Sequence, residues 1–249
     1  MSEFSNHLRH WRQTRRFSQL DLALEANVSA RHISFLETGR ARPSREMITQ
    51  LGDALAIPLS ARNQMFAAMG FASRYEARCW DEAEMAPIRR AIDRTLDRHA
   101  PYPGIAIDRL WRLTRMNTSA QKIFGTLGLS EGDSMLEVLS NPLLWEMVEN
   151  WPEVAHNTML RLRTESATQG GVPELEAAAR DLAEHARIGA NVGPTVPTVF
   201  RFGDQRLAMF GTIAQFGTPE DTALEELKIE LFFPSDVETE NALKTMFQD

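Results

Sequence analysis

The side chains best suited to binding another molecule lie close together between residues 29 and 45. The polar side of a segment with helical apolar spacing carries Ser29, Arg31, His32 and Ser34. An arginine in this position can donate two hydrogen bonds to O6 and N7 of guanine, the commonest base-specific contact in DNA recognition. The alternative is an ordinary solvated helix face, because arginine is common on protein surfaces.

Further polar residues flank this segment. Arg40, Arg42 and Arg45 follow it on a predicted loop and helix start, and Gln19 offers a neutral donor at the start of an earlier helix. Such donors bind phosphate oxygens, which position a protein on DNA without reading its sequence. We therefore expect these residues to contact the sugar-phosphate backbone, with an affinity that falls as the salt concentration rises.

Short helices must position these side chains. Apolar periodicity and capping residues predict helices over residues 4–15, 18–26 and 30–38, and a fourth that begins at residues 43 and 44. Asn27 tolerates the left-handed conformation of a tight turn, and Gly39 can end the third helix. Two helices joined by a short turn can place the second one in a major groove. Their predicted core consists of Phe4, Leu8, Trp11, Ala23, Ala26, Val28, Ile33, Leu36, Ile48, Leu51 and Leu55.

The charge distribution agrees with a DNA-binding N-terminal part. The chain of 249 residues has a net charge of −7, which by itself argues against a nucleic-acid partner. Residues 1–80, however, contain eleven arginines, no lysine and seven acidic residues, a net charge of +4, which leaves −11 on residues 81–249. The alternative is a chance segregation of surface charge.

The remaining residues predict a second domain of mixed structure. We expect a helix-turn-helix domain over residues 1–70, a helical connector over 71–100 and an α+β domain over 101–249. Predicted strands lie within 104–117, at 198–202 and 207–215 with a turn at Gly203–Asp204, and at 227–233. Predicted helices cover 117–124, 135–148, 153–163, 174–186 and 237–247, and residues 218–221 form a further helix start.

The segment SQLDLALEANVSARHISFLETGRARPS resembles the Xre/Cro-type helix-turn-helix family of phage repressors and bacterial regulators. Its pattern is met by Gln19, Ala23, Val28, Ile33, Glu37, Gly39 and Pro43, with Asn27 where glycine is usual. The resemblance implies a mainly α, lambda-repressor-like fold and a double-stranded DNA operator as partner. It also implies that bases are contacted by Ser29, Ala30, Arg31 and His32.

The later segments YPGIAIDRLWRLTRMNTSAQKIF, ENWPEVAHNTMLRLR and FGTPEDTALEELKIELFFP resemble the MmyB-like ligand-binding domain. Asn117 and Trp151 match its pattern. The resemblance implies a PAS-like α+β fold, a homodimer and, for some members, a fatty-acid-like apolar ligand.

Aromatic residues suit the walls of an apolar pocket, although they are more often plain core. The candidate ligand-binding residues are Trp111, Asn117, Phe124, Trp145, Trp151, His156, Phe202 and Phe210. Asn117 can equally cap a helix, and a lone histidine such as His156 is commonly structural. Arg161 and Arg163 can each pair with a carboxylate ligand or with an acid of the protein.

Other classes of function find little support. The sequence has no nucleophile elbow, zinc-protease motif, P-loop or dinucleotide fingerprint, so we expect no enzyme, no catalytic residue and no cofactor. The scattered histidines and the single Cys79 indicate no metal site and no internal disulfide. No apolar stretch approaches the roughly 20 residues that span a bilayer, and no secretory signal begins the chain, so we expect a cytoplasmic protein.

The preferred interpretation is a dimeric transcription regulator modulated by a small apolar effector. The main alternative keeps the DNA-binding head but makes the second domain a dimerisation or protein-interaction module without a pocket. An enzyme fused to a DNA-binding head comes third.

Overall fold

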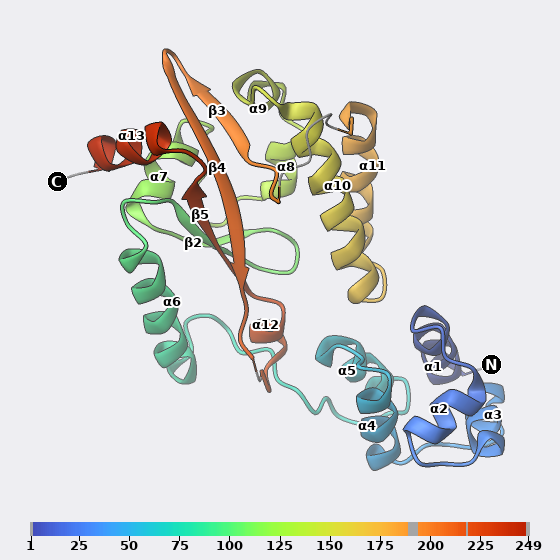
Figure 1. The fold of residues 1–249 in the computed structure, drawn as a ribbon. Helices are drawn as coiled ribbons and strands as arrows, with labels where there is room; N and C mark the ends of the chain where they lie inside the picture. The colour runs from blue at the N-terminus through green and yellow to red at the C-terminus, as the bar shows by residue number, and fades with distance from the viewer. Residues whose placement is uncertain (1, 189–193, 218, 248–249) are drawn as a thin grey trace. The chain divides into compact units, whose positions relative to one another are not determined.

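The computed structural model describes residues 2–188, 194–217 and 219–247. Contacts divide the chain into two compact units, coloured along the chain in Figure 1. One unit comprises Met1–Arg78, Ala167–Gly171 and Thr218–Glu225, and the other comprises Cys79–Ser166, Val172–Gly217 and Glu226–Asp249. Each unit has a hydrophobic core of its own.

The N-terminal unit is helical. Its main helices are α1 (Glu3–Thr14), α2 (Gln19–Glu25), α3 (Ala30–Thr38), α4 (Arg45–Ala54) and α5 (Leu59–Ala67). A serine side chain accepts a backbone N–H at the start of each of the first four: Ser2, Ser18, Ser29 and Ser44. Ser18 and Asp21 form the reciprocal pair of bonds of a capping box. These caps satisfy donors that a helix start otherwise leaves unpaired.

The core of this unit joins one apolar face from each helix. Every residue expected in this core is buried or, for Val28, half-buried and packed against it. Asn27 has a φ of 47° and Gly39 a φ of 73°, so the chain takes the left-handed conformation both between α2 and α3 and after α3. The expected arrangement of two helices around a tight turn is therefore confirmed.

The C-terminal unit is an α+β domain. Its helices and strands are a 3₁₀ turn (Ala83–Met85), α6 (Ala86–Arg98), β1 (Gly104–Ile107), β2 (Leu113–Met116), α7 (Thr118–Gly125), α8 (Met135–Leu139), α9 (Pro142–Met147), α10 (Trp151–Thr168), α11 (Pro173–His185), β3 (Thr198–Phe202), β4 (Gln205–Ala214), β5 (Lys228–Pro234) and α13 (Val237–Phe247). In the described residues, five strands form one antiparallel sheet in the order β2-β1-β5-β4-β3.

Apolar side chains cover both faces of this sheet, as the successive residues of β1 show. Ile105 and Ile107 belong to the large core that also contains residues of α10 and α11, whereas Ala106 packs with Ile92 and Leu96 of α6. Successive side chains of a strand point to opposite faces. The sheet therefore separates two apolar layers, the larger on the side of α10 and α11 and the smaller on the side of α6 (Figure 1).

Two sequence predictions were wrong in detail. The helix expected over 135–148 is two helices, α8 and α9, because Pro142 disfavours helical backbone at Asn141 before it. The helix start expected at 218–221 lies later: α12 spans Thr222–Glu225, and residues 219–221 are not helical. Thr218, its expected N-cap, lies outside the described residues.

Asn117 links three elements of the C-terminal unit and is 3% exposed. Its Oδ1 accepts the backbone N–H groups of Ala120 in α7 and Gly104 in β1, at 2.9 and 3.1 Å. Its Nδ2 donates to the backbone oxygens of Leu96 and Tyr102, at 3.0 and 2.9 Å. One side-chain amide thus ties the end of α6 to the first strand and the next helix.

Replacing Asn117 with alanine should lower the free energy of unfolding by about 2–4 kcal/mol, because buried backbone groups lose their partners. Thermal and denaturant unfolding of the full chain measure this loss. The exposed Asn157 of α10 gives a matched control, and Asn157→Ala should stay within about 0.5 kcal/mol of the wild type. Equal stability of Asn117→Ala and Asn157→Ala would contradict the structural role of Asn117.

Candidate nucleic-acid interface

Helix α3 has one buried side and one open side. Ile33, Leu36 and Glu37 are buried, Arg31 is exposed, and His32 and Ser34 are half-buried. Ser29 caps the helix by accepting the N–H of His32 at 3.1 Å, and Ala30 packs against the helical core. The candidate base-contacting residues therefore gather on the N-terminal half of one short helix. Ala30 lies against the core, and the other candidates lie clear of the buried side.

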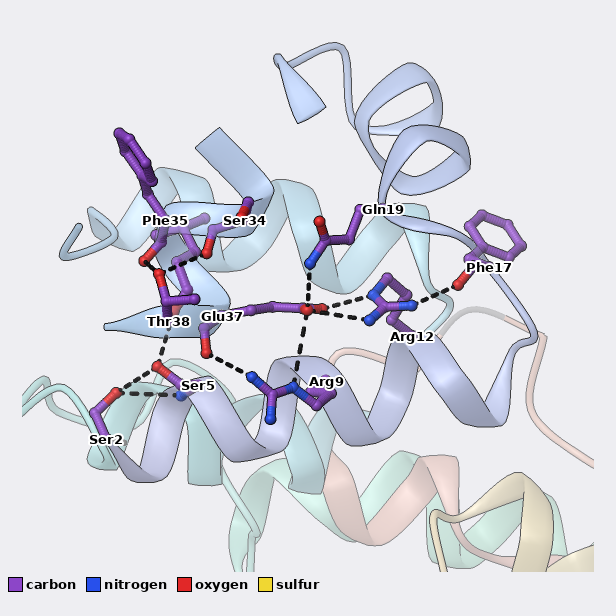
Figure 2. Close-up of polar contacts among 11 residues, drawn as sticks. Ser2, Ser5, Arg9, Arg12, Phe17, Gln19, Ser34, Phe35, Glu37 and Thr38 are labelled. Carbon is purple, nitrogen blue, oxygen red and sulfur yellow. Dashed lines mark hydrogen bonds and ion pairs between the residues drawn. The ribbon is translucent and has the colours of Figure 1, made fainter. Parts of the chain in front are cut away.

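A buried carboxylate fixes the other side of α3. Figure 2 shows Glu37 surrounded by donors from α1 and α2. Arg12 donates from Nε and Nη2 to the two carboxylate oxygens at 2.6 and 3.0 Å, and Gln19 donates to Oε2 at 2.8 Å. Arg9 adds a hydrogen bond to the backbone oxygen of Glu37 at 3.0 Å. These bonds, together with the Ser5 hydroxyl on the backbone oxygen of Leu36, tie α3 to the two preceding helices.

The electrostatics of Glu37 follow from these contacts. Burial opposes ionisation of its carboxyl group, but hydrogen bonds from Arg12 and Gln19 and the positive charges of Arg12 and Arg9 outweigh that cost. The pKa of Glu37 is therefore lowered from its ordinary value of 4.5. The ionised carboxylate is the form that accepts the hydrogen bonds from Arg12 and Gln19.

The four candidate phosphate ligands differ in their surroundings. Arg40 and Arg42 are exposed in the loop after α3, and within the described residues neither guanidinium makes a hydrogen bond or ion pair. Arg45 instead stacks on the rings of Phe66 and Phe71, at 5.2 and 5.5 Å, and donates to the backbone oxygen of Ala72. The amide of Gln19 is committed to Glu37.

This arrangement suits a groove-binding helix. The open face of α3 presents a guanidinium without a hydrogen bond or ion pair to the described residues, an imidazole and hydroxyls. The loop after α3 presents two further guanidinium groups. Base edges meet the first set and phosphates the second when such a helix enters the major groove.

Sequence reasoning missed two groups of residues. The network of Arg9, Arg12 and Glu37 was not foreseen, although a glutamate one residue after Leu36, on the apolar side of α3, signals a buried acid that needs a basic partner. Phe35 was also missed: its ring lies beneath Arg31, with the guanidinium carbon 5.1 Å from the ring centroid.

The candidate ligand-binding residues do not form one group. Trp111, Phe124, Trp145, Trp151 and Phe202 all contribute to the large core on one face of the sheet. Phe210 lies on the opposite face, where it stacks on Phe233 at 5.8 Å, because its neighbour Met209 points into the large core. His156 is half-buried on α10.

Three of these residues are held by polar contacts. Asn117 uses all of its hydrogen-bonding groups on backbone partners. The indole N–H of Trp111 donates to Glu165 at 2.8 Å, and that of Trp145 donates to the backbone oxygen of Leu139 at 2.9 Å. By contrast, the buried indole N–H of Trp151 has no hydrogen-bond partner among the described residues.

A buried charge network lies beside Trp111. Arg161 pairs with Glu165 and Glu230, Lys228 pairs with Glu165, and the Arg161 guanidinium lies 4.4 Å from the Trp111 ring centroid. Burial disfavours ionisation of Glu165, but the charges and hydrogen bonds of Arg161 and Lys228 prevail and lower its pKa. The sequence left open whether Arg161 pairs with a carboxylate ligand or with an acid of the protein. In the structure it pairs with two acids of the protein.

The described residues contain no cluster of His, Cys, Asp and Glu that could hold a metal ion. Within them, no helix is both long enough and apolar enough to cross a membrane. A surface hollow of the C-terminal unit is lined in part by Glu137, Glu174 and Asp181, which do not suit an apolar acid.

Replacing Glu37 with glutamine should lower the stability of the N-terminal unit by about 2–4 kcal/mol, because Arg12 loses its buried counter-charge. Since folding lowers the pKa of Glu37, its contribution is fully present above pH 4.5 and is lost as the pH falls through the lowered value. Hydrogen exchange of the α3 amides measures both effects in the full chain.

The exposed Glu25 supplies the control: Glu25→Gln should change neither the exchange rates nor their dependence on pH. Unchanged protection of α3 in Glu37→Gln, or an acid sensitivity equal to that of the wild type, would show that the carboxylate does not hold α3.

Comparison with known protein families agrees with both units. Residues 3–65 match a helix-turn-helix domain, and residues 88–246 match the MmyB-like transcription regulator ligand binding domain. No curated protein matches the chain. The matched domains are those of a DNA-binding transcription regulator that is modulated by a ligand. Since the second match covers more than half of the 249 residues, the chain belongs to the MmyB-like transcription regulators.

Proposed function

We propose that this chain binds a double-stranded DNA operator as a homodimer, with α3 in the major groove, and that a small apolar effector in the C-terminal domain changes its affinity. The observation that carries the DNA-binding part is the open face of α3. Its Arg31 makes no ion pair with the described residues, and Arg40 and Arg42 stand exposed beside it. A guanidinium whose N–H groups donate to nothing in the protein is available to a base or a phosphate.

The proposed base contacts come from Ser29, Ala30, Arg31, His32 and Ser34, and the proposed phosphate contacts come from Gln19, Arg40, Arg42 and Arg45. Among the latter, the two loop arginines are the stronger candidates. Arg45 and Gln19 contribute more to holding the domain together, through the aromatic stack and through Glu37.

The homodimer follows from the size of the DNA-binding unit. One small module supplies a limited interface, and paired recognition helices read operators with two-fold symmetry about one helical turn apart. We place the protein in the cytoplasm because its proposed partner is operator DNA, and we assign it no enzymatic activity.

The unpaired N–H of Trp151 supports an effector site. A buried donor without a partner is costly, and a carboxylate or carbonyl of a bound molecule would satisfy it. Trp145, whose ring stacks on Trp151 with 6.2 Å between centroids, would form part of the same apolar wall. An effector acts only to the extent that it binds one conformation of the dimer more tightly than the other.

A second candidate for the C-terminal domain is an interaction module without a pocket. The observation that favours it is the satisfied interior: Asn117, Trp111 and Arg161 all find partners within the protein.

The DNA-binding proposal is tested by selecting binding sequences from random duplexes with the full-length protein. On the selected site, Arg31→Ala should lose about 5- to 150-fold of base discrimination at one position. Arg42→Ala should weaken all sequences similarly and reduce the slope of log affinity against log salt by about 0.9. Arg94, exposed on α6, gives the control, and Arg94→Ala should bind like the wild type. Failure to select any sequence would refute sequence-specific DNA binding.

The effector proposal is tested with Trp151→Phe, which keeps an aromatic side chain but removes the indole N–H and part of the ring volume. Titration calorimetry with dodecanoate as the probe should show binding to the wild type and about tenfold weaker binding to the variant. The ligand-free variant should lose stability only through the smaller buried volume, because its N–H has no hydrogen bond to lose. In the control Trp145→Phe, the lost bond to Leu139 should lower stability by about a further 1 kcal/mol.

If Trp151→Phe binds dodecanoate as tightly as the wild type does, the N–H is not part of an effector site. If the wild type itself binds no such acid and co-purifies with no small molecule, the interaction module becomes the better description of the domain.

A further inference from the structure

Phe35 is a large aromatic residue that does not serve the core. It stands between Ser34 and Leu36 on α3 and is half-buried, but the apolar cluster of the N-terminal unit includes Ile33 and Leu36 and not Phe35. In Figure 2 its ring points away from the Glu37 network. Core packing therefore leaves this side chain without an explanation.

The ring of Phe35 instead contacts the side chain of Arg31. The two residues are four apart on the helix and so share one face. The guanidinium carbon of Arg31 lies 5.1 Å from the ring centroid, within the range of a cation–π interaction. Within the described part of the chain this ring is the one partner of the guanidinium, which makes no hydrogen bond and no ion pair there.

Stacking has a different effect on an arginine than an ion pair has. The N–H groups of a guanidinium point outward in its plane, so a ring against its flat face leaves them free to donate. An acid in the same place would consume the donors that a guanine needs. The stack also restricts a side chain that otherwise loses considerable rotamer entropy when it is ordered.

Arg45 shows the contrasting case in the same unit. It also stacks on aromatic rings, but one of its N–H groups donates to the backbone oxygen of Ala72. Its guanidinium is therefore bound within the protein, whereas that of Arg31 is oriented and left open.

We propose that Phe35 is a positioning residue for base recognition: its ring orders the guanidinium of Arg31 in advance for a bidentate contact with guanine. The inference rests on the proposed DNA-binding function and adds to it a residue that makes Arg31 selective. Preorganised donors bind with less loss of entropy, so the guanine contact depends on the ring as well as on the arginine.

The test uses the full-length protein and its selected operator, with the guanine read by Arg31 replaced by 7-deazaguanine, which lacks the N7 acceptor. The measured quantity is the ratio of the two dissociation constants. We expect a ratio of about ten for the wild type and near one for Arg31→Ala. Phe35→Leu keeps apolar bulk but has no ring face, and its ratio should fall to about two to three. Phe35→Tyr keeps the ring face and should retain the wild-type ratio.

The double variant Phe35→Leu with Arg31→Ala should match Arg31→Ala alone, because both changes act on one contact. The exposed Leu24 of α2 supplies the matched control, and Leu24→Ala should leave the ratio unchanged. Thermal unfolding of each variant separates altered recognition from a loss of folded protein.

These outcomes distinguish a failure of the proposed DNA binding from a failure of the proposed role of Phe35. If the wild type selects no DNA sequence, the proposed function fails. If it selects a site at which Arg31→Ala abolishes the ratio but Phe35→Leu keeps it, DNA binding stands and the positioning role of Phe35 is overturned. A ratio lost equally in Phe35→Leu and Phe35→Tyr would also overturn that role, because the ring face would not be the cause.

Discussion

The carboxylate of Glu37 lies where three helices meet, and the direction of the recognition helix depends on it. Its backbone belongs to α3, its bidentate partner Arg12 to α1 and its amide partner Gln19 to α2. Ionised groups are costly to bury, so such a pair tolerates little change in geometry. Apolar contacts among Leu8, Ile33 and Leu36 hold the helices together but are not directional. The ion pair fixes the orientation of α3 relative to α1, and this orientation determines the direction in which the open face of α3 points.

The C-terminal domain uses polar groups in a similar way, with two exceptions among the buried indole N–H groups of its described residues. Asn117 joins α6, β1 and α7, and the charges of Arg161, Glu165 and Lys228 join α10 to the sheet. Buried polar groups that find partners define one arrangement of the elements around them. The N–H groups of Trp80 and Trp151 do not follow this rule within the described residues. Of the two, Trp151 belongs to the large core and stacks on Trp145, which is why we propose the effector site there.

Much of the fold was predictable from local signals. Serine caps, the residues Asn27 and Gly39 and the apolar periodicity define α1 to α4, because each of these signals acts within a few residues. The break at Pro142 was within reach of the same reasoning, since proline constrains the residue before it. What sequence could not supply are pairings across long separations, such as Arg161 with Glu230.

The candidate site divides in the same way. Arg31, Arg40 and Arg42 were foreseen from their types and spacing, and the structure leaves all three open. The hydrogen bond from Gln19 to Glu37 and the contact of Arg45 with the ring of Phe66 depend on tertiary packing. The spacing of residues along the sequence does not predict such packing. Likewise, aromatic residues of both sheet faces were grouped as one pocket. Met209 and Phe210 must point to opposite faces of β4, but the sequence did not show which of them meets the large core.

The open positive charges around α3 are all guanidinium groups, and residues 1–80 contain no lysine. An arginine keeps its charge at any pH that a folded protein tolerates, whereas a lysine amine can be acetylated and lose it. The positive charge of these arginine side chains is therefore permanent, and lysine acetylation, which tunes many DNA-binding proteins, has no side-chain target in residues 1–80. Modification of lysine side chains is thus closed to this surface as a means of weakening DNA binding, so the proposed control by an effector acts through a change of conformation instead.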